Sequence, residues 1–279
     1  MFKRLLRRIT YLINACILIL FNPLEFSKLV GKLDLSYQIR FYLLGNNDPD
    51  LKKFLGYVTQ LATSRKISGG RGVKNYSSDF QDFFVLFHIE SIKSNVSDFF
   101  FIDIGAYNGI TKSNTKLLEE RGMQGLLIEP QESLYADLAS NRTNSIINSA
   151  LVSDRNKSIN WTKKGTGQDF SLSYSDNSNP YTGSIITVSE FLEKFNFLVH
   201  QKKLYISLDI EGMDLELLKE LFRLGLRPEI ISIEHNHDHY IKKELHKLAG
   251  EMQYKVCFGN FFRNEFVLTR QQKSAQGVK

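Results

Sequence analysis

An acidic residue and two glycines lie close together at the end of a short apolar run, residues 99–106, where a turn is expected. Asp103 lies near the end of this run, and Gly105 and Gly109 follow it. The glycines permit a sharp turn and let a ligand approach backbone N–H groups closely. A dinucleotide site prefers Gly-x-Gly-x-x-Gly at such a turn, but the second glycine of that pattern is missing here. Because a carboxylate is a poor neighbour for a diphosphate, Asp103 favours a cationic or amine-bearing ligand.

A second acid, Glu129, ends the next apolar run and is followed by Pro130. A carboxylate in this place can accept hydrogen bonds from both ribose hydroxyls of a nucleotide-like ligand. S-adenosylmethionine combines such a ribose with a sulfonium and an α-amino group, so it suits both acids. The alternative is an ordinary strand-to-helix turn with a surface acid, and acids at two successive strand ends argue against it.

Asp209 and Glu211 stand two positions apart at the end of a third apolar run, before a glycine. Such side chains lie on the same side of an extended chain, so both acids are candidates to face a sulfonium and a methyl acceptor. Methyl transfer to a hydroxyl requires that the acceptor is aligned and loses its proton. The candidate bases are Asp209, Glu211 and His235. Asp209 fits equally well a role in binding the cofactor's amino group, and a solvated acid pair capping the next helix is a third interpretation.

Three histidines alternate in the segment 234–239, at the end of a fourth apolar run. His235 could join Asp209 and Glu234 around a divalent ion that binds the acceptor oxygen. A polar strand-to-helix loop of this composition is more often solvated or capping. A metal is therefore not the favoured interpretation, and the sequence assigns no metal ligands.

The elements that must position these residues are short apolar runs that alternate with amphipathic ones from about residue 99. The predicted strands are 99–106, 125–130, 145–152, 158–164, 204–210 and 229–235, with closing strands at 254–259 and 265–269. The predicted helices are 111–121, 131–141, 186–196, 214–224 and 239–249. This alternation predicts a parallel sheet with helices on both faces, which binds ligands beyond the carboxyl ends of its strands.

The net charge of +6 is concentrated at the two ends of the 279-residue chain. The first eight and last ten residues hold seven of the 36 Lys and Arg side chains and none of the 30 acids. A nucleic-acid-binding protein spreads its basic residues over a folded face, so we expect no nucleic-acid partner. Two cysteines exclude a disulfide framework.

The first 21 residues combine the basic start MFKRLLRR with the apolar run ITYLINACILILF. The run is short for a membrane-spanning helix, which needs about 20 apolar residues. We predict an interfacial helix whose basic residues face anionic lipid headgroups. The alternatives are a single-pass anchor or uncleaved signal, and a helix that packs on the domain. We expect a cytoplasmic protein, with residues 1–21 able to associate with the inner face of a membrane.

The segments 79–85, 99–130 and 207–221, together with Asn141-Arg142, resemble the FkbM-type methyltransferases, which use S-adenosylmethionine. The resemblance extends from about residue 77 to residue 270 and implies a Rossmann-like doubly wound sheet of about seven strands with an antiparallel closing strand. It implies that the glycine turn contacts the methionine part of the cofactor and that Glu129 binds its ribose. It also implies that Ser149-Ala150 flank the adenine and that Gln81 closes over the cofactor. The cofactor-binding residues that it assigns are Gln81, Asp103, Gly105, Ala106, Gly109, Glu129, Pro130, Ser149 and Ala150. Tyr107 departs from the smaller residues usual in this glycine turn, so its role is open.

We therefore predict a basic and apolar segment 1–25, a mainly helical extension 26–76, a methyltransferase domain 77–270 and a flexible tail 271–279. The predicted activity is methyl transfer from S-adenosylmethionine to a hydroxyl of a glycan or small-molecule acceptor. The hydroxyl and the acceptor class rest on the resemblance alone. The alternative is a non-catalytic, membrane-associated binding or trafficking protein that retains the fold, and a nicotinamide-dependent enzyme is a weaker third.

Overall fold

The computed structural model describes residues 48–63, 73–163, 170–174, 180–201, 203–210, 212–235, 237–258, 262 and 265–271. The contacts divide the chain into two compact units, Met1–Lys74 and Asn75–Lys279. The segment 1–25, all of the tail 271–279 except its first residue, and Glu211 lie outside the described residues. Among the described residues, no helix is both long enough and apolar enough to cross a membrane.

Within the first unit, the described helix is α4 (Pro49–Thr63). It begins with a cap, because the side chain of Asp48 accepts hydrogen bonds from the N–H groups of Asp50 (2.9 Å) and Leu51 (3.1 Å). Proline at the first helical position needs no hydrogen bond for its nitrogen. The buried side chains recur at helical spacing, which makes α4 amphipathic; they are Leu51, Phe54, Leu55, Val58 and Leu61.

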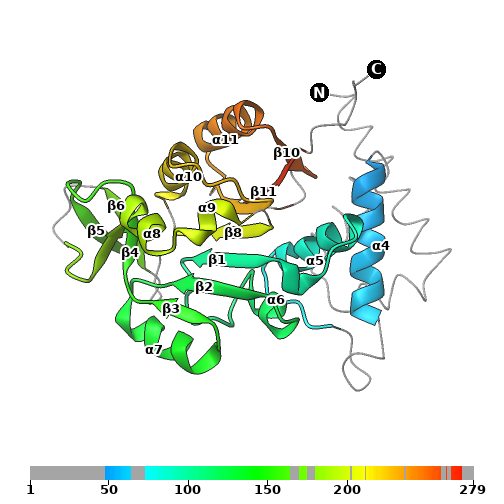
Figure 1. Cartoon of the computed structure of the whole chain (residues 1–279), viewed down its shortest axis with the longest axis horizontal. Helices are drawn as coiled ribbons and strands as arrows, with labels where there is room; N and C mark the ends of the chain where they lie inside the picture. Colours follow the sequence, from blue (N-terminus) through cyan, green and yellow to red (C-terminus); the bar gives the residue numbers. More distant parts are fainter. Residues whose placement is uncertain are drawn as a thin grey trace, which may run out of the picture. The chain divides into compact units, whose positions relative to one another are not determined.

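The second unit is built on a seven-stranded sheet with the order β10-β11-β9-β8-β1-β2-β3 (Figure 1). Its strands are β1 (Phe100–Ile104), β2 (Gln124–Ile128), β3 (Ser145–Ile147), β8 (Leu204–Leu208), β9 (Ile230–Glu234), β10 (Tyr254–Cys257) and β11 (Glu265–Arg270). Neighbouring strands are parallel, except that β11 runs antiparallel to both β9 and β10. The predicted Rossmann-like doubly wound sheet of about seven strands with an antiparallel closing strand is confirmed.

Helices and two small sheets complete this unit (Figure 1). The helices are α5 (Gln81–Ser91), α6 (Lys116–Glu120), α7 (Glu132–Asn141), α8 (Val188–Lys194), α9 (Phe197–His200), α10 (Asp214–Arg223) and α11 (His239–Glu251). The small sheets are a parallel pair, β4 (Ala150–Val152) with β7 (Ile185–Thr187), and a hairpin of β5 (Ile159–Lys163) with β6 (Phe170–Tyr174).

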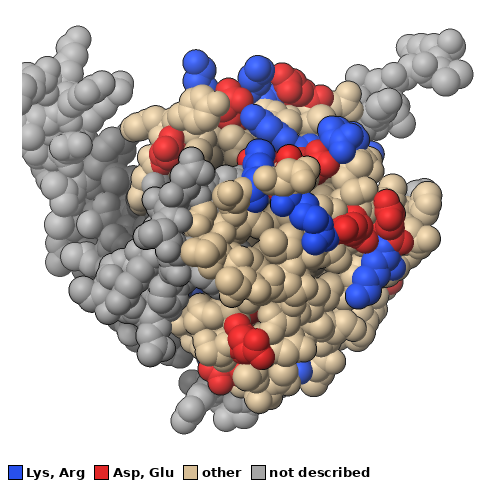
Figure 2. Space-filling view, turned by 90° about the vertical axis from the view of Figure 1, so that its left-hand side faces the viewer, with Lys and Arg blue, Asp and Glu red and all other residues tan. Residues whose placement is uncertain are grey.

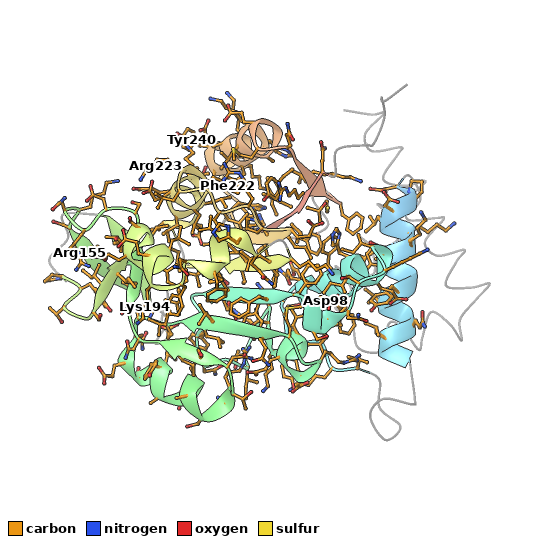
Figure 3. The ribbon with its side chains drawn as sticks, in the orientation of Figure 1. Asp98, Arg155, Lys194, Phe222, Arg223 and Tyr240 are labelled. Carbon is orange, nitrogen blue, oxygen red and sulfur yellow. The ribbon has the colours of Figure 1, made fainter. Side chains whose placement is uncertain are left out.

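One face of the large sheet is aliphatic. Ile102, Ile206, Ile231 and Leu268 pair with one another across four strands, and side chains paired in this way share a face. The buried residues of α8, α10 and α11 form one core cluster with this face. In Figure 3, Phe222 on α10 lies on the inner side of the helix; it is 3% exposed, while the side chain of its neighbour Arg223 is 66% exposed.

The opposite face of the sheet carries buried polar side chains in two rows. Asp103, Ser207 and Ser232 pair across β1, β8 and β9, and in the next row Glu234 pairs with Glu265 of β11. All five residues are buried. Because a buried carboxylate or hydroxyl has to find partners or a function, the two faces of the sheet have different tasks. The aliphatic face holds the fold together, and the polar face is a candidate for the site.

The predicted strand 145–152 is wrong in one respect, because the structure divides it. Residues 145–147 form β3 beside β2, whereas residues 150–152 form β4 and pair with β7 in another sheet. The break falls at Ser149, whose hydroxyl contacts that of Ser184 (2.8 Å), while the next N–H donates to the Ser184 carbonyl (2.8 Å). The run therefore leaves one sheet and enters the other at Asn148-Ser149, two residues of types that favour turns.

The predicted helix 111–121 is also shorter than expected, because only α6 (Lys116–Glu120) is helical. The side-chain oxygen of Asn108 accepts the N–H groups of Ile110 (3.0 Å) and Thr111 (2.8 Å), which closes a local turn instead. Lys112 then adopts a left-handed conformation (φ 56°), which interrupts any helix. The segment between the glycine turn and α6 is therefore an irregular loop.

Candidate functional site

A pocket of about 300 Å³ lies at the carboxyl ends of β1, β2 and β8. Of the residues predicted to bind the cofactor or to act in catalysis, those that line it are Asp103, Gly105, Ala106, Glu129, Pro130, Ser149, Ala150 and Asp209. The structure thus brings together side chains from segments that are far apart in the sequence. The volume is at the lower end of the range for small-molecule sites.

Asp103 is a buried carboxyl in the lining of the pocket. Its Oδ2 accepts a hydrogen bond from the Thr115 hydroxyl at 2.5 Å. Burial raises the pKa of Asp103, and the nearby Arg142 charge together with hydrogen bonds from Thr115 and Ser207 offsets part of this rise. Burial thus opposes the ionised form of Asp103, and a cationic ligand beside it would favour that form.

Glu129 is the second pocket carboxyl, and each of its oxygens holds a backbone donor. Oε2 accepts from the Tyr107 N–H (2.9 Å) and Oε1 from the Gln131 N–H (2.8 Å). Burial raises its pKa to about 7, the two backbone hydrogen bonds oppose the rise, and the charge of Asp103 adds to it. Glu129 thereby connects the glycine turn after β1 to the end of β2.

The backbone N–H groups of the glycine turn are already engaged. Those of Gly105 (3.0 Å) and Ala106 (3.1 Å) donate to the Ile128 carbonyl, and that of Gly109 donates to the Ala106 carbonyl (3.0 Å). With Tyr107 donating to Glu129, these donors are not presented to an anion. No helix begins at this turn in the described chain, since α6 starts only at Lys116. The turn therefore lacks the donors that a dinucleotide pyrophosphate needs.

The two glycines of the turn serve different purposes. A Cβ on Gly105 would lie 2.0 Å from the Asp209 carbonyl oxygen, and its φ is 85°, so the turn presses directly against the end of β8. A Cβ on Gly109 would lie 2.6 Å from Leu138 and 2.7 Å from Arg142. Gly109 does not line the pocket; it allows the turn to pack on α7 and the residue after it, rather than on a ligand.

Asp209 lines the pocket just after β8, and its N–H donates to the Ile104 carbonyl (3.1 Å). The loop that follows is shaped by Asp214, which accepts the N–H groups of Ile210 (2.9 Å) and Gly212 (3.0 Å). The candidate base Glu211 stands in this loop but outside the described residues. Asp209 is thus held at the point where β1 and β8 meet.

Residues 103–256 match the family described as "Methyltransferase FkbM domain". This match spans more than half of the chain. The chain belongs to this family. A search of the curated proteins finds no match.

Two similar solved structures are also methyltransferases. A methyltransferase from Podospora anserina with S-adenosylhomocysteine bound is 10% identical with a TM-score of 0.36, covering 86% of this chain and 89% of that one. A precorrin-6y C5,15-methyltransferase from Geobacter metallireducens is 10% identical with a TM-score of 0.36, covering 77% of this chain and 94% of that one. At these values, the acceptors of those proteins indicate nothing about the acceptor of this FkbM domain.

His235 lies in the FkbM domain but not in the pocket lining. It is 1% exposed, its Nδ1 accepts the His237 N–H (3.1 Å), and its ring packs on Phe266 with centroids 4.8 Å apart. Burial, followed by the charges of Lys242 and His237, lowers its pKa to about 4. Among the described residues, no group of three His, Cys, Asp or Glu side chains could hold a metal ion.

Gln81 lies N-terminal to the matched region and outside the pocket lining. It begins α5 and is fully buried, with its Oε1 accepting the Asp79 N–H at 2.9 Å. Its position is close to Glu265 at the start of β11. The structure thus places Gln81 beside the polar face of the sheet.

Several lining residues of the FkbM domain were not singled out from the sequence; they include Thr111, Lys112, Ser113, Asn114, Gln131, Leu134, Ser207 and Met213. Only Ser207 carried a signal, since it stands two positions before Asp209 in the same strand. Asn114 donates to the Ser207 hydroxyl (3.1 Å) from an irregular loop that no periodicity reveals. Tyr107, whose role was open, lines the pocket in a left-handed conformation (φ 51°).

Proposed function

We propose that this FkbM domain transfers a methyl group from S-adenosylmethionine to a hydroxyl of a small-molecule or glycan acceptor. The observation that carries the proposal is the pocket at the sheet edge, where three successive strand ends supply Asp103, Glu129 and Asp209. Acidic walls suit a donor that carries a sulfonium and an ammonium group. They oppose a diphosphate, as do the occupied N–H groups of the glycine turn.

The donor set of the pocket fits the parts of S-adenosylmethionine. A carboxylate has about four lone-pair sites, so Glu129 retains acceptor capacity for ribose hydroxyls beside its two backbone donors. Asp103, in the lining of the same pocket, offers charge to the amino group. Lys112, a basic residue in the lining, is available to the donor's carboxylate. Ser149 and Ala150 provide a small surface for the adenine.

The bound donor supplies a methyl group that is already activated by its sulfonium. The chain then has to hold the acceptor oxygen in line with that group and accept its proton. As the acceptor O–C bond forms and the C–S bond breaks, the hydroxyl proton passes to a base, for which Asp209 is our candidate. Its other role, binding the amino group, is distinguished by whether Asp209→Asn loses turnover or donor affinity. Glu211 and His235 remain further candidate bases, although His235 is buried outside the pocket.

The charge distribution on the described part of the face in Figure 2 favours a small acceptor over a nucleic acid. On the face shown in Figure 2, Lys and Arg side chains lie among Asp and Glu side chains. Ion pairs such as Arg155–Glu190 (2.6 Å) and Lys219–Glu244 (3.2 Å) neutralise basic residues of the second unit. Nucleic-acid binding requires a continuous basic surface.

Isothermal titration of the full chain with S-adenosylmethionine tests this function, with NAD⁺ as the competing ligand. We expect binding of the first and none of the second. Candidate acceptors are then incubated with isotope-labelled donor and searched for labelled methyl ethers by mass spectrometry. If the folded chain bound no S-adenosylmethionine, the proposal would be overturned in favour of the non-catalytic alternative. NAD⁺ binding alone would indicate a nicotinamide enzyme.

A further inference from the structure

Lys112 lies in the lining of the pocket, in the loop between the glycine turn and α6. Its backbone is left-handed (φ 56°), a conformation that glycine adopts readily, asparagine less so, and most other residues only at a cost in free energy. The described part of the chain offers its ammonium group no ion pair and no hydrogen bond. A lysine kept in such a place indicates that its side chain has a task in the pocket.

The charges of the pocket show what that task is. Among the described residues that line the pocket, Lys112 is the one cationic side chain, whereas Asp103, Glu129 and Asp209 are acids. The acids suit the sulfonium and ammonium groups of the donor, but they repel its carboxylate. Because an anion that leaves water needs a counter-charge, the carboxylate requires a cation beside it. Lys112 is the lining residue that can supply one.

The backbone of Lys112 is held by the segment that precedes α5. Ser77 pairs with Lys112 in a parallel bridge. Its neighbour Tyr76 donates its hydroxyl to Glu120 at the end of α6 (2.7 Å). Residues 76 and 77 therefore contact the chain both before α6 and at its end, so that their place sets the place of Lys112.

Asp82, in the first turn of α5, fixes Tyr76 and Ser77. Its Oδ2 accepts the N–H groups of Tyr76 (2.9 Å) and Ser77 (3.4 Å), and its Oδ1 accepts the Ser77 hydroxyl (2.7 Å). Asp82 is 0% exposed, and burial raises its pKa to about 6, although hydrogen bonds from Tyr76, Ser77 and Phe83 oppose the rise. A buried carboxyl costs free energy of folding. The contacts of Asp82 direct this cost to the segment that pairs with Lys112.

We propose that Asp82 is a positioning residue for the methyl donor: through Ser77 it fixes the backbone of Lys112, whose ammonium group binds the donor's carboxylate. This inference rests on the proposed function and adds the contact that the acids of the pocket cannot make. An ammonium group only donates hydrogen bonds and a carboxylate only accepts them, and hydrogen bonds between charged groups are the strong ones. The chain therefore selects ligands that carry the carboxylate.

The test compares S-adenosylhomocysteine with its decarboxylated analogue S-adenosyl-3-thiopropylamine by isothermal titration of the full chain. The analogue keeps the adenosine, the thioether and the amino group, so the difference in affinity reports the carboxylate alone. We expect the wild-type chain to bind S-adenosylhomocysteine at least about tenfold more tightly than the analogue. Lys112→Asn, which removes the charge and suits a left-handed backbone, should remove this preference without lowering the thermal midpoint. Lys112→Arg, which keeps the charge, should retain it.

Lys93→Asn is the matched control. Lys93 is also exposed and left-handed (φ 54°), but it lies outside the pocket lining, so its replacement should leave the preference intact. Asp82→Asn should reduce the preference, because one of its two oxygens becomes an amide NH₂ that accepts no hydrogen bond. The same substitution should have no further effect on the preference in the Lys112→Asn chain, because Asp82 acts through the lysine. Ser77→Ala repeats this comparison with a smaller change to the buried network.

A preference that survives Lys112→Asn would overturn the anchor. Equal effects of Asp82→Asn with and without Lys112 would overturn the positioning role, because the two residues would then act independently. A wild-type chain that bound both ligands with equal affinity would overturn the inference and leave the proposed function in place. Binding of neither ligand would overturn the proposed function itself, so the two failures are distinguishable.

Discussion

Both carboxylate oxygens of Glu129 hold backbone donors, yet the pKa of the group rises to about 7. Burial is the largest cause of the rise. The carboxyl is thus close to half ionised near neutral pH, which is unusual for a glutamate. A residue in this state can fix the turn around Tyr107 and still respond to a ligand that prefers its ionised form.

We expect Glu129→Ala to weaken the affinity for S-adenosylmethionine by about 1–3 kcal/mol, because hydrogen bonds to an ionised acceptor are lost. The wild-type affinity should also rise with pH and level off above about 7, where the carboxylate is ionised before binding. Below that pH, binding should release a proton, which calorimetry in buffers of different ionisation enthalpy measures. Glu132→Ala, an exposed acid three positions away, is the control. Unchanged affinity in Glu129→Ala would refute the ribose assignment.

The three acids that the sequence pattern identified share one property, which is a place at the end of a recognisable strand. Asp103, Glu129 and Asp209 follow from apolar runs and from the rule that parallel strands end at one edge. Glu265 does not, because its place at that edge depends on β11 running antiparallel beside β9. Asn114 was missed for another reason, since it lies in a loop where a helix was predicted. Long-range pairing and irregular backbone have no local signature.

At the scale of elements, Arg142 after α7 ties the loop of the glycine turn to α6. Its Nε donates to Glu119 (2.5 Å), its Nη2 to the Thr115 hydroxyl (3.0 Å) and its Nη1 to the Gly109 carbonyl (3.2 Å). Thr115 in turn donates to Asp103. The arginine side chain is 0% exposed. The pocket carboxyl Asp103 is therefore oriented by a buried network that spans α6, the loop and α7.

Arg142→Met should destabilise the chain by about 3 kcal/mol, the lower end of the cost of breaking a buried ion pair, because Glu119 keeps Lys116 (3.3 Å) as its remaining charge partner. Burial tends to raise the pKa of Glu119, but the Arg142 charge and hydrogen bonds from Thr143 and Asn144 lower it to about 2. The ionised group contributes stability above its usual pKa of 4.5, and this contribution is lost as pH falls towards 2. Denaturant unfolding between pH 7 and pH 3 should show less loss in the variant.

The control for this network is the ion pair of the exposed Arg223 with the half-buried Glu220, visible at Arg223 in Figure 3. Arg223→Met should leave the free energy of unfolding unchanged within error, because exposed pairs contribute little. Equal effects of the two substitutions would show that Arg142 is not an organising residue.

The alternation of strands and helices in the sequence predicted most elements correctly. Two of the predicted boundaries were wrong, for physical reasons. The predicted helix 186–196 contains α8, which begins after Thr187, the residue that forms a capping box with Glu190. The run 145–152 was divided because β4 pairs with β7, a partner distant in sequence. Residues 111–115 are not helical because the Asn108 side chain competes for the backbone N–H groups. Tertiary pairing and side-chain capping thus override local periodicity.

At the scale of the molecule, the large sheet separates stability from chemistry. Its aliphatic face forms a core with α8, α10 and α11, and its polar face carries the acids that lead from the pocket to Glu265. A substitution on the first face should change stability alone. The predicted site lies entirely in the unit Asn75–Lys279, whereas the basic N-terminal segment belongs to the unit Met1–Lys74.

This division allows the predicted membrane association to be tested apart from the site. Deleting residues 1–21 removes four basic residues and the apolar run, so it should abolish binding to vesicles that contain phosphatidylserine, because both attractions are lost. S-adenosylhomocysteine affinity and far-UV circular dichroism should show that the sheet remains folded.

Replacing Lys3, Arg4, Arg7 and Arg8 by Gln removes only the charge, and should reduce binding to anionic vesicles more than to neutral ones. Deleting residues 272–279 controls for the basic tail. Vesicle binding that persists without residues 1–21 would place the membrane contact elsewhere in the chain.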